Sequence, residues 1–310
     1  MSTISSKSPV VVVVGSANID LTSYARRLPE GGETLIGDSF SEGFGGKGAN
    51  QAVMAALAGA EVHFIGSVGN DQFGRALISN FEQYGINTLG INIAETSSGI
   101  AHIWVDDTGE NRILIIPGAN ATNSPQSVEK ALAAIPHLDF IIGQCEIPQE
   151  ATLAAFQAGK SRGATTILNP APYEALSDEL LAATDWLIPN ESEFALLDKF
   201  SRLPDSSPVI SELRPSKNLI VTLGDEGAAI AQGNFPVIYV ESTKVHSIDS
   251  TGAGDCFIGS FTAGIGLGLN PQEATRFACQ CAAFSVTRKG AQASYPTREE
   301  SAKFITLSAK

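Results

Sequence analysis

The chain has 310 residues, a formal net charge of −13, and a composition of 43% hydrophobic and 17% charged residues. Such a mixture is typical of a chain that buries a large core, and it excludes an intrinsically disordered protein. The negative charge opposes contact with nucleic-acid backbones and anionic lipid headgroups, so we expect no nucleic-acid or membrane partner. No apolar run in the sequence approaches the roughly 20 residues of a membrane-spanning helix.

The N-terminus and the cysteines indicate a cytoplasmic protein. Residues 1–9 are polar and rich in serine, without the apolar stretch of a signal peptide, and we expect a flexible tail there. The four cysteines, at 145, 256, 279 and 281, form no CxxC pair, and no histidine stands at zinc-finger spacing. We expect them to be small, buried, reduced residues, as is usual in the cytoplasm.

Taken in chain order, short β-branched runs alternate with longer runs that are rich in alanine and leucine. They predict strands at 10–15, 61–66, 140–143, 165–168, 186–188 and 218–223. They predict helices at 50–58, 72–84, 127–135, 149–161, 271–288 and 298–307. This alternation predicts one α/β domain over residues 1–310, with a mainly parallel sheet covered by helices on both faces.

Two segments break this alternation. The segment at about 17–44 has a strand-like pattern without a helix, and the segment at about 98–117 is typical of a hairpin with strands at 100–105 and 112–116. We expect the two segments to pair as a small antiparallel sheet that projects from the main domain and serves as a lid over a pocket. The alternative is an edge extension without a function.

Asn18 and Asp20 follow the first predicted strand. Ligands of open α/β sheets bind at the carboxyl ends of the strands. Strand alternation places the two side chains on one face, where paired acceptors can chelate vicinal hydroxyl groups. The alternative is a simple Asx turn.

The segment 45–50 reads GGKGAN, and it is not a Walker A loop because GxxxxGK[ST] is absent. Its glycines permit close contact between the backbone and a polar ligand. Lys47 and Asn50 add directional donors that suit sugar hydroxyls. The alternative is an ordinary strand-to-helix turn.

Two further segments follow predicted strands. Asn190 and Glu193 share one helical face, where they could organise Mg²⁺ and its waters or, alternatively, cap the helix. The segment 222–227 reads TLGDEG and lies between two strands. It could contact a nucleotide phosphate through its hydroxyl and backbone N–H groups, or it could be a plain hairpin turn.

The segment 249–255 reads DSTGAGD and leads into an apolar helix. The N–H groups of Gly252, Ala253 and Gly254 would point outward from the helix N-terminus, which forms an anion hole for a developing phosphoryl charge. Asp255, in the first turn, is placed to accept a proton from an attacking hydroxyl. The alternative is a glycine-rich helix cap with an acidic first turn.

Together these motifs resemble the ribokinase family of sugar kinases, also called the PfkB family, over about 10–295. The motifs at 45–50 and 249–255, in this order and about 200 residues apart, are the most specific part of the match. Gly59 and Gly69 lie at the expected distances, and the shorter segments GSANID, QCE, NPAP and RKGAQ agree as well. The resemblance implies a Rossmann-like fold with a β-sheet lid that often forms a homodimer interface. It also implies transfer of the ATP γ-phosphoryl group to the 5-hydroxyl of D-ribose, giving D-ribose 5-phosphate.

Carried over by residue, the resemblance implies four sets of ligand-binding positions. Asp255 would be the base, and the sugar would be held by Asn18, Asp20, Gly46, Lys47, Asn50 and Glu146, together with Asp255. The nucleotide would contact Asn190, Thr222, Gly224, Gly227, Gly254 and Cys279. Mg²⁺ would bind Glu193 through water. A monovalent cation, K⁺, would lie behind the anion hole, in part on backbone carbonyls, at Asp249, Thr251, Ser285, Arg288, Gly290 and Ser294.

Three departures from the family pattern bear on the nucleotide side. Ser260 stands where alanine or glycine is usual, so local helix packing is expected to differ. The acidic pair at 225–226 should weaken ATP binding unless a cation intervenes. The segment 198–217 lacks the expected helix, which indicates a reduced nucleotide side.

Two other functions are left open by the sequence. The first is a kinase of 2-deoxy-D-ribose, another free sugar or a nucleoside. The hydroxyl-binding set favours a small sugar over a nucleoside, which would need an aromatic stacking surface, but it does not separate ribose from 2-deoxyribose. The second is a non-catalytic sugar sensor, which the presence of Asp255 and its flanking glycines disfavours.

Overall fold

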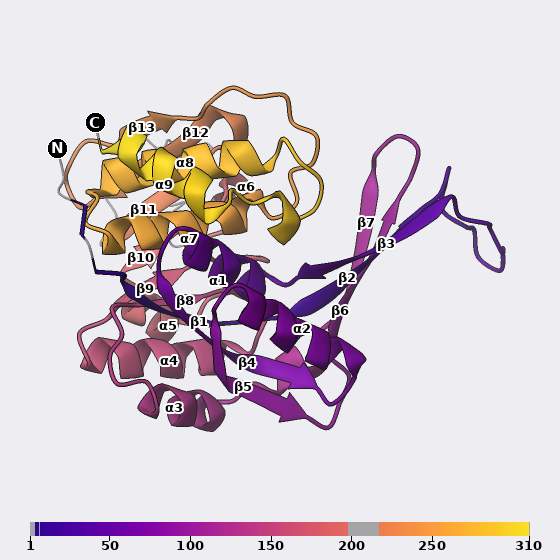
Figure 1. The fold of residues 1–310 in the computed structure, drawn as a ribbon, viewed down its shortest axis with the longest axis horizontal. Coiled ribbons are helices and arrows are strands. Elements are labelled where there is room, and N and C mark those ends of the chain that lie inside the picture. The colour runs from indigo at the N-terminus through magenta and orange to yellow at the C-terminus, as the bar shows by residue number, and fades with distance from the viewer. Residues whose placement is uncertain (1–3, 6, 198–216, 310) are drawn as a thin grey trace.

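The main body of the molecule is a nine-stranded sheet between two layers of helices (Figure 1). The computed structural model describes residues 4–5, 7–197 and 217–309. The strand order is β13-β12-β11-β10-β9-β8-β1-β4-β5. All pairs from β5 to β11 are parallel, and β12 and β13 are added in antiparallel orientation. The strands are β1 (Val10–Val14), β4 (Glu61–Gly69), β5 (Asn87–Ala94), β8 (Phe140–Gly143), β9 (Thr165–Leu168), β10 (Trp186–Leu187), β11 (Asn218–Thr222), β12 (Gly227–Gln232) and β13 (Ile238–Glu241).

The side chains of β1 alternate between two hydrophobic cores, one on each face of the sheet. Val11 and Val13 belong to one core, and Val10, Val12 and Val14 belong to the other. The first core is covered by α1 (Lys47–Leu57), α2 (Gln72–Gln83), α7 (Ala253–Gly266), α8 (Pro271–Ser285) and α9 (Arg298–Ser308). The second is covered by α3 (Pro125–Ala133), α4 (Gln149–Ser161), α5 (Asp178–Ala183) and α6 (Glu191–Leu196). The predicted Rossmann-like, mainly parallel fold is confirmed.

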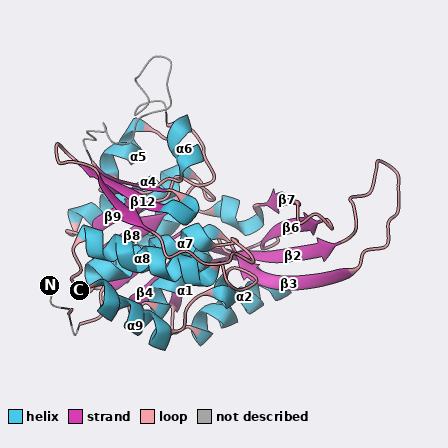
Figure 2. Cartoon of the chain, turned by 90° about the horizontal axis from the view of Figure 1, so that it is seen from above, coloured by secondary structure: helices cyan, strands magenta, loops and turns pink. Residues whose placement is uncertain are grey.

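A separate four-stranded sheet projects from the main body (Figures 1 and 2). Its order is β3-β2-β6-β7, and its strands are β2 (Asn18–Tyr24), β3 (Ser39–Gly45), β6 (Gly99–Val105) and β7 (Asn111–Ile116). The predicted hairpin is present as β6 and β7. The expectation of an all-antiparallel sheet is wrong, because β2 and β6 pair in parallel. A whole β4–α2–β5 unit separates them in the chain, which supplies the long connection that parallel pairing requires.

Each strand and helix whose bounds were predicted outside the lid has a counterpart within three residues at either end. Among the strands of the described residues, β12 was expected after the segment 222–227 but without bounds, and β5 and β13 were not expected. Near the N-terminus, the Ser5 N–H donates to the Leu267 carbonyl at 2.8 Å, and the Glu61 N–H donates to the Pro9 carbonyl at 2.9 Å. The sequence also predicted that the segment 198–217 lacks a helix. Apart from Lys217, this segment lies outside the described residues.

Candidate active site

The loop after β8 holds the N-terminus of α1 in place. The Glu146 carboxylate accepts hydrogen bonds from the Lys47 backbone N–H (3.0 Å) and from the Ser16 hydroxyl (2.5 Å). A carboxylate at this end of a helix also interacts favourably with the helix dipole. Glu146, which the resemblance assigns to the sugar, therefore also positions the glycine-rich segment 45–50.

Asp20 lies on β2, next to this segment. A Cβ atom at position 45 would stand 2.2 Å from the Asp20 Oδ1 atom, so the absence of a side chain at Gly45 makes room for the carboxylate. Burial, followed by the negative charges of Glu146 and Asp255, raises the pKa of Asp20 from its ordinary value of 3.8 to about 7. The structure thus gathers three of the predicted carboxylates at one place.

Lys47 supplies positive charge among these carboxylates. Burial lowers the pKa of Lys47, but the negative charges of Asp255, Glu146 and Glu193 outweigh this effect, so that its pKa is raised above 10.5. The ammonium group therefore stays protonated. It offsets part of the negative charge of these carboxylates.

The sequence predicted Asn18 as a hydrogen-bond acceptor for a ligand, but its side-chain oxygen already has a partner in the protein. Its side-chain oxygen accepts a hydrogen bond of 2.7 Å from the Asn120 Nδ2 atom, and the side chain is 3% exposed. Asn120 belongs to the short helix η1 (Gly118–Thr122) and also bonds both backbone groups of Ala17. The amide N–H groups of Asn18, rather than its oxygen, are therefore available to a ligand. No sequence motif pointed to Asn120.

Asp255 is buried in the first turn of α7 and is held from α1. It is 6% exposed, and its two carboxylate oxygens accept one hydrogen bond each, from Asn50 Nδ2 (3.0 Å) and from Gln51 Nε2 (2.9 Å). Gln51 directly follows the glycine-rich motif but was not predicted as a site residue. The contact joins the two most specific sequence motifs, as one catalytic site requires.

The N-terminus of α7 presents backbone N–H groups beside this carboxylate. Gly252 precedes the helix with φ of 73°, a left-handed conformation that favours glycine. Within the described residues, the N–H groups of Gly252, Gly254 and Asp255 have no backbone acceptor. The Ala253 N–H differs from expectation, because it donates to the Ser250 carbonyl at 3.2 Å. Asp255 N–H is thus a further candidate donor to an anion.

A cavity of about 250 Å³ opens on the other side of the α7 N-terminus. It is lined by five predicted nucleotide-side residues, namely Thr222, Gly224, Gly227, Gly254 and Cys279. Its apolar lining includes Phe257 on α7 and Val286 just after α8, which suits the flat face of a nucleobase. The segment 242–245, which also lines it, follows β13 and was not anticipated. The cavity therefore adjoins the predicted anion hole.

Asn190 and Glu193 are not in the lining of this cavity, and they cap α6. The Asn190 side chain accepts from the Glu193 N–H (2.8 Å), and the Glu193 carboxylate accepts from the Asn190 N–H (2.9 Å). This is the alternative that the sequence had left open. Glu193 is still coupled electrostatically to the site. Burial raises its pKa, while the positive charge of Lys47 lowers it and the negative charge of Asp255 raises it.

Lys244 provides a cation beside the acidic loop 225–226. Its Nζ atom lies 3.2 Å from the Asp225 carboxylate and 2.9 Å from the Asp225 carbonyl oxygen, and both residues line the nucleotide cavity. The positive charge offsets the Asp225 carboxylate at the place where nucleotide phosphates would approach. Lys244 therefore neutralises part of the negative charge of the loop 225–226.

We expect Lys244→Ala to raise the KM for ATP about 2- to 5-fold without changing kcat, because an exposed charge pair is screened by water. The double variant Lys244→Ala with Asp225→Asn should recover most of the loss. Steady-state kinetics at fixed saturating sugar would measure both. An equal effect of Lys244→Ala in the presence and absence of the Asp225 charge would contradict this coupling.

Asp249 joins the segment before α7 to the loop after α8. One carboxylate oxygen accepts from the N–H and hydroxyl of Thr251 (2.9 and 2.6 Å), and the other accepts from the Gly290 N–H (2.8 Å). The predicted cation residues at Ser285 and Ser294 are buried, and their hydroxyls donate to the carbonyls of Ala282 and Ala291. Arg288 stacks on the Phe284 ring, 4.2 Å from its centroid.

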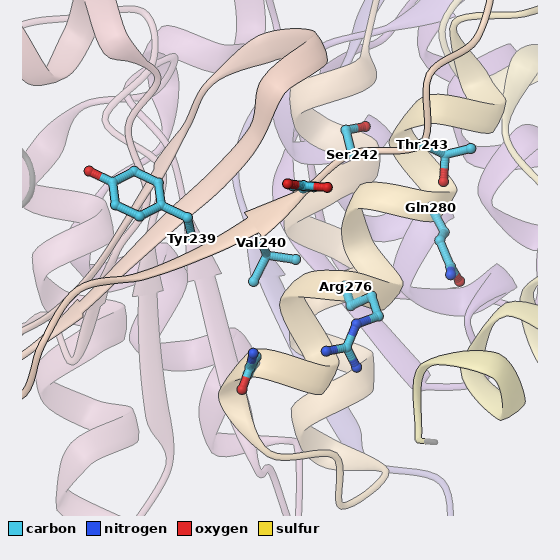
Figure 3. A pocket seen from close by; sticks show the side chains of 8 residues that line it. Tyr239, Val240, Ser242, Thr243, Arg276 and Gln280 are labelled. Atoms are coloured by element: carbon cyan, nitrogen blue, oxygen red, sulfur yellow. The ribbon is translucent and has the colours of Figure 1, made fainter.

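All four cysteines are free and buried, as expected, and Cys279 is also one of the residues that line the nucleotide cavity. Ser260 is fully buried on α7. A second cavity, of about 400 Å³, lies between β13 and α8, where Arg276 and Gln280 face the segment 239–243 (Figure 3). None of the predicted site residues lines it. In the part of the chain that the structure describes, no His, Cys, Asp and Glu side chains form a metal-binding group of three, and no helix is long and apolar enough to cross a membrane.

A buried carboxylate at a helix N-terminus, beside a cluster of polar side chains on one side and a cavity on the other, is the arrangement that phosphoryl transfer between two bound ligands requires. Comparison with known proteins supports this class. The family described as pfkB family carbohydrate kinase matches residues 9–298. The chain belongs to this family and is an ATP-dependent sugar kinase.

Three known proteins illustrate the relationship. A ribokinase of Schizosaccharomyces pombe is 38% identical over 301 residues, covering 93% of this chain and 95% of its own. A deoxyribokinase of Salmonella typhi is 36% identical over 304 residues, with coverages of 96% and 99%. The structure of Arabidopsis thaliana ribokinase complexed with ribose and ATP superimposes with a TM-score of 0.84 at 27% identity, with coverages of 96% and 99%.

Proposed function

We propose that the protein transfers the γ-phosphoryl group of ATP to the 5-hydroxyl of D-ribose, giving D-ribose 5-phosphate. The position of Asp255 carries this proposal. Its carboxylate accepts a hydrogen bond from Asn50 of the sugar-side motif. The two residues before Asp255, Ala253 and Gly254, line the nucleotide cavity. Asp255 therefore stands between the two ligands whose atoms would react.

In this mechanism Asp255 accepts the proton of the sugar hydroxyl as that oxygen attacks the γ-phosphorus. The N–H groups of Gly252 and Gly254 face the oxygens of the moving phosphoryl group and stabilise their charge. Ala253 would have to share its N–H with Ser250 to take part. Phosphoryl transfer depends mainly on positioning and electrostatics, which fixed helix and loop termini can supply.

The sugar would lie between the lid and α1. Asn18 offers amide N–H donors, Lys47 an ammonium group, and Asp20 and Glu146 carboxylate oxygens, while Gly46 allows close approach. A mixture of donors and acceptors suits a small polyhydroxylated ligand. A deoxyribokinase is nearly as similar to this chain as the ribokinases are, so 2-deoxy-D-ribose is the second candidate acceptor.

The test is ADP release with ATP, Mg²⁺ and K⁺, comparing D-ribose, 2-deoxy-D-ribose, fructose and adenosine. We expect the highest kcat/KM with D-ribose. A higher value with another acceptor would keep the role of Asp255 and overturn the assignment of the sugar. The absence of turnover with all four, in folded protein, would instead support a sugar sensor.

Mg²⁺ would enter with the ATP phosphates, with Glu193 holding one of its waters, and it would neutralise charge on the phosphates. The partly buried carboxylate of Glu193, electrostatically coupled to Lys47 and Asp255, fits this outer position. K⁺ would sit behind the anion hole. The donor set fits a cation in kind, because carboxylate, hydroxyl and carbonyl oxygens are ligands of hard cations, and Asp249 joins the two loops that carry Thr251 and Gly290.

We further propose that the chain acts as one α/β unit whose lid, at 17–44 and 98–117, forms a homodimer interface in the cytoplasm. Strand alternation places Trp104, Leu114 and Ile116 on the lid face opposite Asp20, and these side chains are 39%, 53% and 39% exposed. Clustered exposed apolar side chains on a projecting sheet favour a protein–protein contact. The reduced cysteines favour the cytoplasmic compartment.

We expect Leu114→Asp to convert a dimer into a monomer, because burying an unpaired carboxylate in the interface is unfavourable. Light scattering after size-exclusion chromatography would measure the mass. Thr108→Asp, in the turn between β6 and β7, serves as a control of equal charge. A monomeric wild-type protein, or a dimeric Leu114→Asp variant, would contradict this interface.

A further inference from the structure

A network of buried carboxamides converges on Asp255 from two sides. On one side Gln144 Nε2 donates to Gln51 Oε1 (2.8 Å), and Gln51 Nε2 donates to Asp255 (2.9 Å). On the other side Asn80 donates to Gln292 (2.8 Å), Gln292 donates to Asn50 (3.0 Å), and Asn50 donates to Asp255 (3.0 Å). The exposed fractions of the five amide side chains lie between 0% and 6%.

The direction of each hydrogen bond follows from the carboxylate at the end. An ionised carboxylate only accepts, so the amide nitrogens of Asn50 and Gln51 must face Asp255. Their oxygens then face outward and require donors, which Gln292 and Gln144 supply. In the described part of the chain the Gln144 Oε1 atom has no partner, so the Gln51 oxygen alone fixes the orientation of this amide.

Gln51 has a second anchor that fixes its position. Its Nε2 atom also donates to the Asn169 side-chain oxygen (3.1 Å), and Asn169 in turn donates to the Ile188 carbonyl (2.9 Å). The Gln51 carboxamide therefore has both N–H groups and its oxygen in use. An amide bonded at three points has one available orientation.

We propose that Gln51 and Gln292 are positioning residues for the catalytic base. Gln51 acts directly on the Asp255 carboxylate, and Gln292 acts through Asn50. Aligned donors hold the carboxylate in one rotamer, so that its oxygens stay in a fixed position to accept the proton. Each carboxylate oxygen can accept more than one hydrogen bond, and each accepts one here, so acceptor sites remain for the sugar hydroxyl. This inference rests on the proposed role of Asp255 as the base.

Other charged and titratable groups act on the same carboxylate. They are Lys47 on α1, Asp20 on β2, Glu193 on α6, Cys256 on α7 and Tyr295 after the short helix η4 (Gln292–Ser294). In the described residues, the two side-chain hydrogen bonds to Asp255 come from neutral amides and from none of these groups. A charge placed at position 51 would therefore change the environment of the base at its nearest contact.

The test compares Gln51→Leu, Gln51→Glu and Gln292→Leu with the wild type. We expect Gln51→Leu to lower kcat about 10- to 100-fold, the effect of losing a hydrogen bond to a charged group. The sugar KM should change less than about 3-fold, because Gln51 holds the base rather than the sugar. Gln292→Leu should lower kcat less, because it acts one residue further away.

Gln51→Glu gives a signature that a structural role would not produce. The carboxyl group that this substitution introduces can donate to Asp255 while it is protonated, whereas it repels Asp255 once it is ionised. We expect the kcat of this variant, relative to the wild type, to fall progressively as the pH is raised from 5 to 9. Leu132→Ala, in the opposite core, should lower Tm without changing the KM or the pH profile.

The outcomes separate this proposal from the function on which it rests. Loss of kcat in the Gln51 variants, with the pH signature, supports the positioning role. Wild-type kcat and pH profile in Gln51→Glu and Gln292→Leu, while Asp255→Asn is inactive, overturn the positioning role alone. Full activity of Asp255→Asn, or a wild type without phosphoryl transfer, overturns both.

Discussion

Asp255→Asn should bind sugar with nearly wild-type affinity and lose at least about 100-fold in kcat, the scale of a general base. The substitution removes the proton acceptor but keeps the shape of the side chain. It also replaces one carboxylate oxygen by an N–H₂ group, which then faces a donor from Asn50 or Gln51. One buried N–H is left without an acceptor, at a cost of about 1–3 kcal/mol in folding free energy.

Three measurements make this result interpretable. Calorimetric titration of D-ribose tests whether sugar binding is retained, thermal unfolding tests the fold, and ADP release gives kcat. Leu132→Ala provides a control for lost stability, because it removes buried contacts in the opposite core while keeping the base and its hydrogen bonds. A folded Asp255→Asn protein with full activity would refute the assignment of the base.

Asp20→Asn should stabilise the ligand-free protein at high pH while weakening sugar binding. The pKa of Asp20 is raised from 3.8 to about 7 by burial and by the charges of Glu146 and Asp255. Each pKa unit corresponds to about 1.4 kcal/mol, so the ionised carboxylate destabilises the fold by an amount on the order of 4 kcal/mol. Neutral asparagine removes this penalty.

The pH dependence of the Asp20 effect has a definite sign. Because the folded pKa exceeds the unfolded one, the folded state binds the extra proton between about pH 4 and 7. The penalty is complete above about pH 7 and disappears below about pH 4. The Tm difference between Asp20→Asn and wild type should therefore be largest near pH 8 and shrink toward pH 5. Thermal unfolding without ligands at several pH values measures it.

The same substitution should weaken sugar binding about 10- to 150-fold, the equivalent of one hydrogen bond to a charged group. Lys47 stays positively charged in the variant, so the net charge of the pocket becomes less negative. Calorimetric titration at pH 8 would measure the affinity. Unchanged affinity together with a raised Tm would show that the Asp20 carboxylate destabilises the fold and has no role in sugar binding.

Local sequence patterns predicted most of the fold. Alternating β-branched and helical runs located β1, β4, β8, β9, β10 and β11 and the helices between them. The strands that were missed, β5 and β13, and the strand that was expected without bounds, β12, carry weaker patterns. β5 is interrupted by Gly90, whose Cβ would lie 2.8 Å from the Ile65 side chain, and this close approach needed glycine at the cost of strand propensity. β12 reads GAAIAQ, with small residues that do not resemble a typical strand.

The lid shows where such patterns stop being sufficient. Its strands were expected, but their parallel pairing between β2 and β6 was not. Strand alternation within a segment says which side chains share a face, and it carries no information on which distant strand lies alongside. That choice depends on how the intervening segment, whose strands β4 and β5 belong to the main sheet, is placed relative to the lid.

The amino-acid sequence by itself determined the chemical groups of the site, because glycine-rich turns and helix starts are specified by neighbouring residues. The motifs at 45–50 and 249–255 were found in this way. Only the tertiary structure decided how the groups are used. Asn120 donates a hydrogen bond to the side-chain oxygen of Asn18, and Gln292 donates one to Asn50, which lies 242 residues away in the sequence. The raised pKa of Asp20 likewise arises from burial and from carboxylates brought together by folding, which no local pattern encodes.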